Sequence, residues 1–147
     1  MDNNVIDSII ENIFHIYPLI YKKLLKVDFE SVEGGLSYLH FLIIRMLAKS
    51  GTLPISEIGK RLVIPRPQMT HLIDQLIVLD MVVRLPNTRD RRIINIELTG
   101  KGKATLQKCV ELARANIKSK LKRLDDGELT ELSVLLSRLN EFSSKLN

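Results

Sequence analysis

Hydrophobic side chains recur at helical spacing near both ends of the chain. Between residues 5 and 27 they return every three or four positions, and Pro18 falls inside this pattern, which predicts a helix with a kink or break at the proline. The same spacing predicts a long helix that Thr99 caps and that runs to about Leu124. A last helix follows Asp125, the first acid of a sequence typical of a helix start.

The first of three shorter helices is predicted to begin at Ser37. Residues 29–35 before it are typical of a loop, and serine is among the preferred residues at a helix N-cap. The apolar periodicity continues to about Lys49, and Gly51 ends the helix. Residues 52–54 then predict a short extended link.

Two further helices follow, with a tight turn between them. Ser56 is expected to cap a short helix that ends near Leu62, and residues 63–66 form the turn. Pro67 suits the first turn of the next helix, where its missing N–H leaves no hydrogen bond unmade. That helix runs to about Leu79. It is expected to turn four apolar residues inward, namely Met69, Leu72, Ile73 and Leu76.

The pattern changes from helical to alternating after residue 80. The stretches MVVRLP and RIINIEL are rich in β-branched residues and predict two strands, with the polar and basic stretch LPNTRDR at the tip of a hairpin. Because an isolated hairpin is only marginally stable in water, this one must pack against the helices beside it. The fold class is therefore expected to be mainly α with a small β-hairpin wing, a winged helix-turn-helix.

Positive charge is concentrated in the middle of the chain. The whole chain has a net charge of +5, whereas residues 45–103 contain eleven Lys and Arg against five Asp and Glu, a net of +6. A basic surface favours an anionic partner, and nucleic acid is the commonest one. We therefore expect double-stranded DNA as the partner, with a helix in the major groove and the hairpin at a neighbouring minor groove or backbone.

The chain of 147 residues is expected to form a single domain, residues 1–147. Residues 37–99 are predicted to be the DNA-binding lobe. Residues 1–36 and 100–147 supply flanking helices whose apolar residues cover more than one narrow stripe, and such a surface usually marks an interface. These segments are predicted to be the dimerisation helices of a homodimer; the alternative is that both ends pack only on their own chain.

Outward side chains of the helix that contains Pro67 are the candidates for reading bases. Gln can bond bidentately to adenine, and Arg to guanine or phosphate. The candidates on this helix are Arg66, Gln68, Thr70, His71 and Gln75. The alternative is an ordinary solvated helix face.

The hairpin tip carries three arginines in four positions. Arg89, Arg91 and Arg92 repel one another, so an anion is the expected partner of this tip. Asp90 can fix one of them by a charge-assisted hydrogen bond. The alternative is a loop whose charges serve only solubility. Two cations of a preceding helix, Lys60 and Arg61, are further candidates for the phosphate backbone.

The stretches ISEIGKRLVIPRPQMTHLIDQL and VVRLPNTRDRRIINIELTGKG resemble the multiple antibiotic resistance regulator (MarR) family. The most specific match is the RDRR tip followed by a strand and the pattern LT-x-x-G, and the flanking helices extend the resemblance over nearly the whole chain. It implies a two-fold dimer that represses transcription from a near-palindromic operator, with half-sites about 34–36 Å apart. It also implies that Arg92 enters the minor groove with Asp90 positioning it, and that Gln68, Thr70 and His71 lie at recognition positions.

The chain departs from the usual pattern of the family at several positions. The family often has Arg where His71 and Gln75 stand, so phosphate contacts are expected to be weaker here. Asp80 stands where the family usually has Gly at the end of the recognition helix, and an Asp tolerates a left-handed turn less well than Gly. Pro67 replaces a hydroxyl residue, and Asn87 replaces an acid.

Members of this family respond to small ligands in a cleft between the dimer body and the DNA-binding lobe. The resemblance therefore implies a small aromatic or anionic effector, which polar aromatic side chains and a cation could hold. The candidates are His15, Tyr17, Tyr21, Tyr38, His40 and Arg45. Each of them is equally well explained as an ordinary packing residue.

Other functions find little support in the sequence. The single cysteine, Cys109, rules out an internal disulfide, fits a reducing cytoplasm and is expected to serve packing. The three histidines are scattered, so neither a metal nor a cofactor is expected. No secretory signal and no membrane span of about 18 apolar residues is found. No nucleophile or phosphate-loop motif indicates an enzyme, and a helical adaptor without DNA binding would leave the RDRR tip unexplained.

Overall fold

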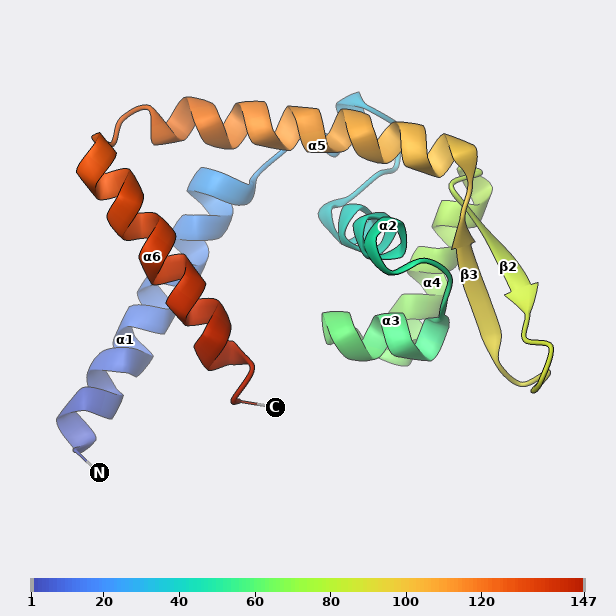
Figure 1. Cartoon of the computed structure of the whole chain (residues 1–147), viewed down its shortest axis with the longest axis horizontal. Coiled ribbons are helices and arrows are strands. Elements are labelled where there is room, and N and C mark those ends of the chain that lie inside the picture. Colours follow the sequence, from blue (N-terminus) through green and yellow to red (C-terminus); the bar gives the residue numbers. More distant parts are fainter. Residues whose placement is uncertain (1, 147) are drawn as a thin grey trace. The chain divides into compact units, whose positions relative to one another are not determined.

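Three short helices and a β-hairpin form the middle of the chain (Figure 1). The computed structural model describes residues 2–146. Its backbone divides into two compact units: residues 27–113, called the lobe below, and residues 2–26 with 114–146, called the terminal unit.

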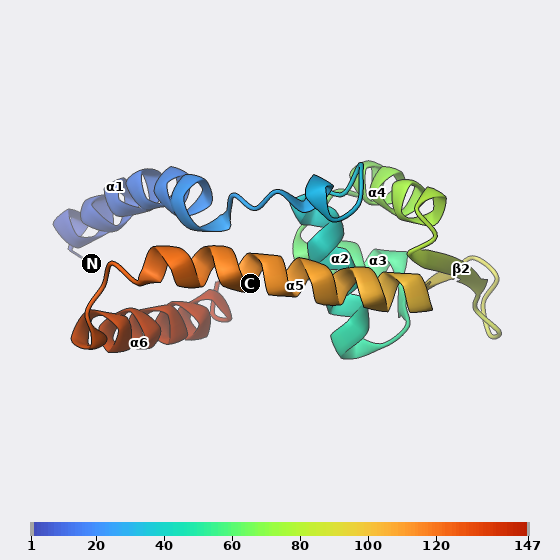
Figure 2. The same cartoon turned by 90° about the horizontal axis from the view of Figure 1, so that it is seen from above.

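The lobe combines the helices with a small antiparallel sheet. Its elements are η2 (Phe29–Ser31, a 3₁₀ turn), α2 (Tyr38–Ser50), β1 (Leu53–Pro54), α3 (Ile55–Leu62), α4 (Arg66–Val78), β2 (Val82–Pro86), β3 (Ile94–Leu98) and the first part of α5 (Gly100–Leu121). The strand order is β1-β3-β2, and the hairpin of β2 and β3 projects away from the lobe's helices (Figure 1, Figure 2). The sequence predicted only two strands. The extended link becomes a third strand because Leu53 pairs with Ile96.

The apolar residues predicted to face inward from α4 form part of the lobe's core. All four are buried: Met69, Leu72, Ile73 and Leu76. They belong to one cluster with side chains of α2, α3, the sheet and the turn before β2, including Ile43, Ile44, Ile58, Ile96 and Met81. Burying one such side chain contributes roughly 1.5–3 kcal/mol. The packing of α4 therefore fixes which of its side chains remain outside.

The N-cap of α2 is formed as predicted. The Ser37 Oγ accepts a hydrogen bond from the His40 backbone N–H at 3.4 Å, and His40 Nδ1 accepts one from the Ser37 N–H at 2.9 Å. This reciprocal pair satisfies two backbone donors that a helix start otherwise leaves without partners.

The predicted starts of the next two helices need correction. Ser56 does not cap α3, because the helix already begins at Ile55, directly after the extended backbone of Pro54. Arg66, predicted to lie in the turn before α4, is the first residue of that helix. Pro67 lies in the first turn of α4, as predicted.

Among residues 2–146, two residues other than glycine adopt left-handed backbone conformations, Val63 (φ 55°) and Asp80 (φ 58°). Asp80 thus adopts the left-handed turn although it stands where the family usually has Gly. The Asp80 N–H donates to the Ile77 carbonyl and the Met81 N–H to the Leu76 carbonyl, both at 2.9 Å, which is the pattern that closes a helix before a glycine. This turn directs the chain from α4 into β2.

Thr99 and Gly102 explain the LT-x-x-G pattern. The Thr99 Oγ1 donates to the Asp80 carbonyl at 2.6 Å and accepts from the Gly102 N–H at 3.0 Å, so it caps α5 as predicted. Gly102 itself touches the backbone of Met81: a Cβ at this position would lie 2.3 Å from the Met81 carbonyl oxygen. Any side chain here would push α5 away from the end of α4.

The terminal unit consists of helices. They are α1 (Asn3–Ile20), η1 (Tyr21–Leu25), the end of α5 and α6 (Asp126–Ser143), which Asp125 caps through a hydrogen bond from the Glu128 N–H at 2.8 Å. The sequence predicted a kink or a break at Pro18. The break does not occur, because α1 continues through Pro18 to Ile20 and then widens into the π-helical turn η1. A change of hydrogen-bond register is a common way for a helix to absorb a local irregularity.

The helices of the terminal unit leave much apolar surface uncovered within one chain. No described residue of α1 or α6 is buried. The exposed apolar side chains include Ile9, Ile13, Phe14, Val134, Leu135, Leu136, Leu139 and Phe142. Within residues 2–146, no helix is both long and apolar enough to cross a membrane.

Replacing Gly102 by alanine should strongly destabilise the lobe. The added methyl group would overlap the Met81 carbonyl and the Leu98 side chain, and overpacking of this kind costs about 1–3 kcal/mol. Urea denaturation followed by circular dichroism measures the change. Gly100→Ala is the matched control, because nothing lies within 4 Å of a Cβ there. Equal stabilities of the two variants would contradict the role of this contact.

Candidate nucleic-acid interface

The predicted reading residues lie on the outer side of α4. Arg66, Gln68, Thr70 and His71 are all exposed at the first half of this helix, while the buried residues of the same helix face the core. The turn between α3 and α4 brings the two helices together, and the left-handed Val63 ends α3 just before that turn. A helix presented in this way can lie against DNA.

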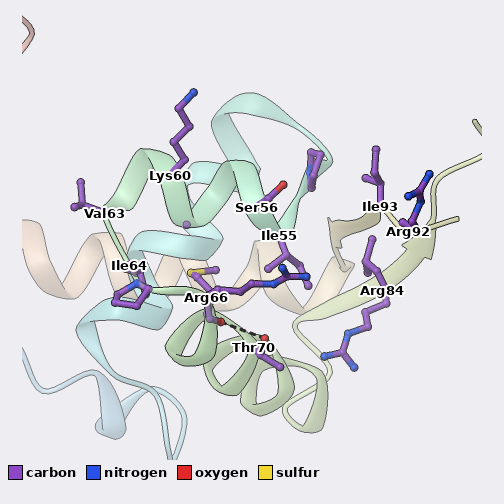
Figure 3. Close-up of a pocket in the computed structure, with 15 residues that line it drawn as sticks. Ile55, Ser56, Lys60, Val63, Ile64, Arg66, Thr70, Arg84, Arg92 and Ile93 are labelled. Atoms are coloured by element: carbon purple, nitrogen blue, oxygen red, sulfur yellow. Dashed lines mark hydrogen bonds between the residues drawn. The ribbon is translucent and has the colours of Figure 1, made fainter. Parts of the chain in front are cut away.

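A groove lined by cations separates α3 and the start of α4 from the hairpin. Its volume is about 900 Å³. Four basic side chains line it, Lys60, Arg66, Arg84 and Arg92, and no acid is among the described residues that do so. Figure 3 shows the Arg66 side chain extending from the start of α4 toward Ile55. This cationic groove favours an anion, because like charges on its walls add their potentials.

The hairpin tip is held by backbone N–H groups that donate hydrogen bonds to two side chains, Asn87 and Asp90. The Asn87 Oδ1 accepts from the backbone N–H groups of Arg89 (2.8 Å) and Asp90 (3.1 Å). Asn87 thus supplies the acceptor that an acid would supply at this position.

Asp90 contacts both the backbone and the side chain of Arg92. Its Oδ1 accepts from the Arg92 backbone N–H at 3.0 Å and lies 3.5 Å from the Arg92 Nε. The Arg92 side chain is 93% exposed, so its guanidinium remains accessible to an anion. Arg89 and Arg91 are also exposed.

Arg61 and Lys60 differ in how they are engaged. The Arg61 Nε donates to Glu57 at 2.8 Å and its Nη1 to Ser50 at 3.2 Å, and the hydrogen bond from Arg61 lowers the pKa of the Glu57 carboxyl. Lys60 is exposed and lines the cationic groove. Lys60 is therefore the better placed of the two for a phosphate.

Sequence reasoning missed Arg84. This residue of β2 lines the cationic groove and forms an ion pair with Asp74 of α4. The alternation of the strand could only indicate that Arg84 is exposed, and a single exposed arginine on a strand does not by itself indicate a binding site. The pairing with Asp74 depends on how the hairpin packs beside α4.

Gln75 is placed differently from the other predicted reading residues. It is half-buried, and its Oε1 accepts from His40 Nε2 at 2.9 Å. Its carbonyl end is therefore turned to a neighbouring helix of the lobe rather than to solvent.

His40 is buried, and its hydrogen bonds fix one tautomer of the neutral imidazole ring. Its Nδ1 accepts from the Ser37 N–H, so the proton of the neutral ring lies on Nε2, which donates to Gln75. Burial lowers the pKa of His40; the hydrogen bond with Gln75 opposes this shift, and the charge of His71 adds to it.

The effector candidates are divided between the two units. Tyr38 stacks on Phe29 with ring centroids 6.4 Å apart, and Arg45 is exposed on α2. His15, Tyr17 and Tyr21 are exposed in the terminal unit. His40 is already occupied by Ser37 and Gln75.

Cys109 is fully buried in the core of the lobe, and burial raises the pKa of its thiol. This environment suits the packing role that the sequence predicted. In the part of the chain that the structure covers, no three His, Cys, Asp or Glu side chains are grouped to hold a metal ion.

A reading helix beside a cationic groove and a basic hairpin define the class of protein, a winged helix-turn-helix DNA-binding protein. Residues 34–93 match the family model of the MarR family. The HTH-type transcriptional repressor YetL of Bacillus subtilis is 33% identical over 114 residues, which cover 74% of this chain and 68% of YetL. The repressor MdtR of the same organism is 25% identical over 134 residues, 90% of this chain and 86% of MdtR.

A solved structure agrees in fold. The crystal structure of a mutant MarR from Escherichia coli complexed with operator DNA has a TM-score of 0.75 at 23% identity, covering 90% of this chain and 96% of that one. The chain belongs to the MarR family of HTH-type transcriptional regulators. The resemblance identified from the RDRR tip and the LT-x-x-G pattern is thereby confirmed.

The stability of the lobe should fall with pH below the ordinary pKa of histidine because of His40. Its pKa is lowered in the folded state, so the unfolded chain binds a proton at higher pH than the folded chain does. Above about pH 6.5, His40 is neutral in both states and does not make the free energy of unfolding depend on pH. As the pH falls from there toward the lowered pKa of the folded state, the unfolded chain takes up the proton first and the free energy of unfolding decreases. Urea denaturation at pH 7.5 and 5.5 should show a larger loss for wild type than for His40→Gln. Equal losses would contradict this account.

Proposed function

We propose that the protein is a homodimer that binds a near-palindromic operator in double-stranded DNA and represses the adjacent promoter. The observation that carries the proposal is the cationic groove, which lies directly beside the exposed start of α4. Its basic side chains match the negative charge of DNA, and the exposed polar side chains next to it match base edges. Such a regulator would act in the cytoplasm, where the DNA of its bacterial relatives lies.

The side chains divide into those that read and those that anchor. We assign base reading to Gln68, Thr70 and His71, because they are exposed on α4. Arg92, held by Asp90, is assigned to the minor groove, where a guanidinium senses groove width. We assign contacts with the phosphate backbone of DNA to the exposed cations nearby, Lys60, Arg66, Arg89 and Arg91.

We assign dimerisation to residues 1–36 and 100–147, and DNA binding to residues 37–99. The uncovered apolar surface of α1 and α6 supports this division, because a monomer would leave it in water. A two-fold dimer presents two copies of α4, which would read two half-sites about one helical turn of DNA apart.

A small aromatic or anionic effector would release DNA by binding better to a dimer in which the two copies of α4 have the wrong spacing. Tyr17 and Tyr21 support such a site, because their phenol rings are exposed in the terminal unit. They offer stacking surface and hydrogen-bonding hydroxyls to a ligand.

Removing the Arg92 guanidinium should weaken specific DNA binding about fivefold or more, since a well-formed arginine contact is worth about 1–3 kcal/mol. The probes are a duplex enriched by wild-type protein from a random pool and a scrambled duplex of the same composition. Fluorescence anisotropy across a salt series compares wild type with Arg92→Ala. Arg114→Ala is the control, because it removes an exposed arginine outside the lobe.

Each result of this experiment has a definite meaning. Tight, salt-sensitive binding to the enriched duplex alone supports a specific regulator. Binding of wild type to neither duplex at low salt would exclude DNA as the partner. Equal effects of Arg92→Ala and Arg114→Ala would remove Arg92 from the interface.

Placing charge on the exposed face of α6 should dissociate the dimer. Leu135 and Leu139 are 57% and 60% exposed in the single chain, and glutamates buried at an interface would carry an uncompensated desolvation penalty. Sedimentation velocity should give twice the chain mass of 16.8 kDa for wild type and the single mass for Leu135→Glu/Leu139→Glu. Val83→Glu, an exposed apolar site on β2, should remain a dimer. A wild-type monomer would contradict the proposal.

A further inference from the structure

Two adjacent residues in the second half of α4 are held by different parts of the lobe. Asp74 is paired with Arg84 of β2, and Gln75 is hydrogen bonded to His40 of α2. Successive residues of an α-helix point about 100° apart, so the two contacts restrain rotation of α4 about its own axis from two directions. The pair of Asp74 and Arg84 is exposed, and exposed ion pairs contribute little.

In the hydrogen bond between His40 and Gln75, only His40 can be the donor. Ser37 presents a backbone N–H to His40 Nδ1 at 2.9 Å, which leaves the ring only one donor, the Nε2–H. That donor meets the Oε1 of Gln75 at 2.9 Å. The cap of α2 therefore determines the tautomer of His40, and the tautomer determines which way the Gln75 amide points.

Gln75 also continues a row formed by two of the three residues assigned to base reading, Gln68 and His71. Gln68, His71 and Gln75 are separated by three and four positions and so share one side of α4. The first two are exposed, and Gln75 is the half-buried end of the row. A contact that fixes Gln75 thus acts on the same side of α4 that faces DNA in the proposed complex.

We propose that His40 is a positioning residue for DNA reading, which holds the reading side of α4 in register through the Gln75 amide. The inference rests on the proposed function. It concerns discrimination rather than overall affinity, because the cations Lys60, Arg66 and Arg92 are not hydrogen bonded to either residue in the described chain. Loss of the contact leaves attraction to phosphates intact and lowers only the affinity that depends on correctly placed base contacts.

The test compares variants on the enriched duplex and on its scrambled counterpart. Gln75→Met removes the acceptor at similar volume and leaves the cap of α2 in place, and His40→Leu removes the donor. Each should bind the enriched duplex about 3–10-fold more weakly, the range that one hydrogen bond accounts for. Affinity for the scrambled duplex and the slope of affinity against salt should stay at the wild-type values.

A conservative variant separates positioning from general stability. His40→Gln has an oxygen that can accept from Ser37 and an amide N–H that can donate to Gln75, so it should restore the wild-type ratio of affinities. The double variant His40→Leu/Gln75→Met should lose no more than either single variant, because both remove the same contact. Gln107→Met, at an exposed glutamine of α5, controls for the substitution itself.

Several outcomes would overturn the proposal. If Gln75→Met keeps the wild-type ratio, the contact does not serve reading. If Gln75→Met loses discrimination while His40→Leu keeps it, Gln75 contacts bases directly and His40 does not position it. If affinity for both duplexes falls equally, the contact only stabilises the fold. A wild type without discrimination between the duplexes would instead overturn the proposed function, and this inference with it.

Discussion

The structure of the lobe depends on the close contact between the end of α4 and the start of α5. Thr99 joins the two through its hydroxyl, and its backbone N–H also donates to the Met81 carbonyl at 3.0 Å. The contact requires Gly102 on one side and a left-handed residue, Asp80, on the other. Because β2 begins directly after this junction and β3 ends directly before it, the base of the hairpin is fixed there too.

The basic side chains of the cationic groove differ in whether they have an acidic partner. Two cations of the groove have acidic partners, Arg84 with Asp74 and Arg92 with Asp90. Among the described ion pairs none involves Lys60 or Arg66. The groove therefore keeps a surplus of positive charge beside α4, which comes from Lys60 and Arg66.

The parts of the fold that follow from local sequence could be predicted. The buried set on α4 follows from helical periodicity, the hairpin from alternation, and the cap at Ser37 from its hydroxyl. Asp90 and Arg92 are two residues apart, so their contact is also local. Whether the helix breaks at Pro18 did not follow from the sequence, because the effect of a proline depends on how the following turn adjusts its hydrogen bonds.

The parts that could not be predicted depend on tertiary contacts. The third strand exists only because Leu53 meets β3, and Gln75 is turned inward only because His40 lies across from it. From the sequence, Gln75 and His71 were both predicted to be outward residues that read bases. The spacing of residues along a helix shows which side of the helix a residue lies on, but not which residues of other elements lie next to it. The candidate DNA-binding residues near the start of α4 and at the hairpin tip were easier, because nothing else in the lobe covers them.

The burial of Cys109 has a practical consequence for spectroscopy. It is the single cysteine of the chain, it is fully buried, and its thiol is held in the less reactive protonated form. A cysteine introduced at an exposed site of α4 would therefore react selectively with a spin label, without prior removal of the native thiol. In a dimer the two labels would report the distance between the copies of α4 by electron paramagnetic resonance, in the free and DNA-bound states alike.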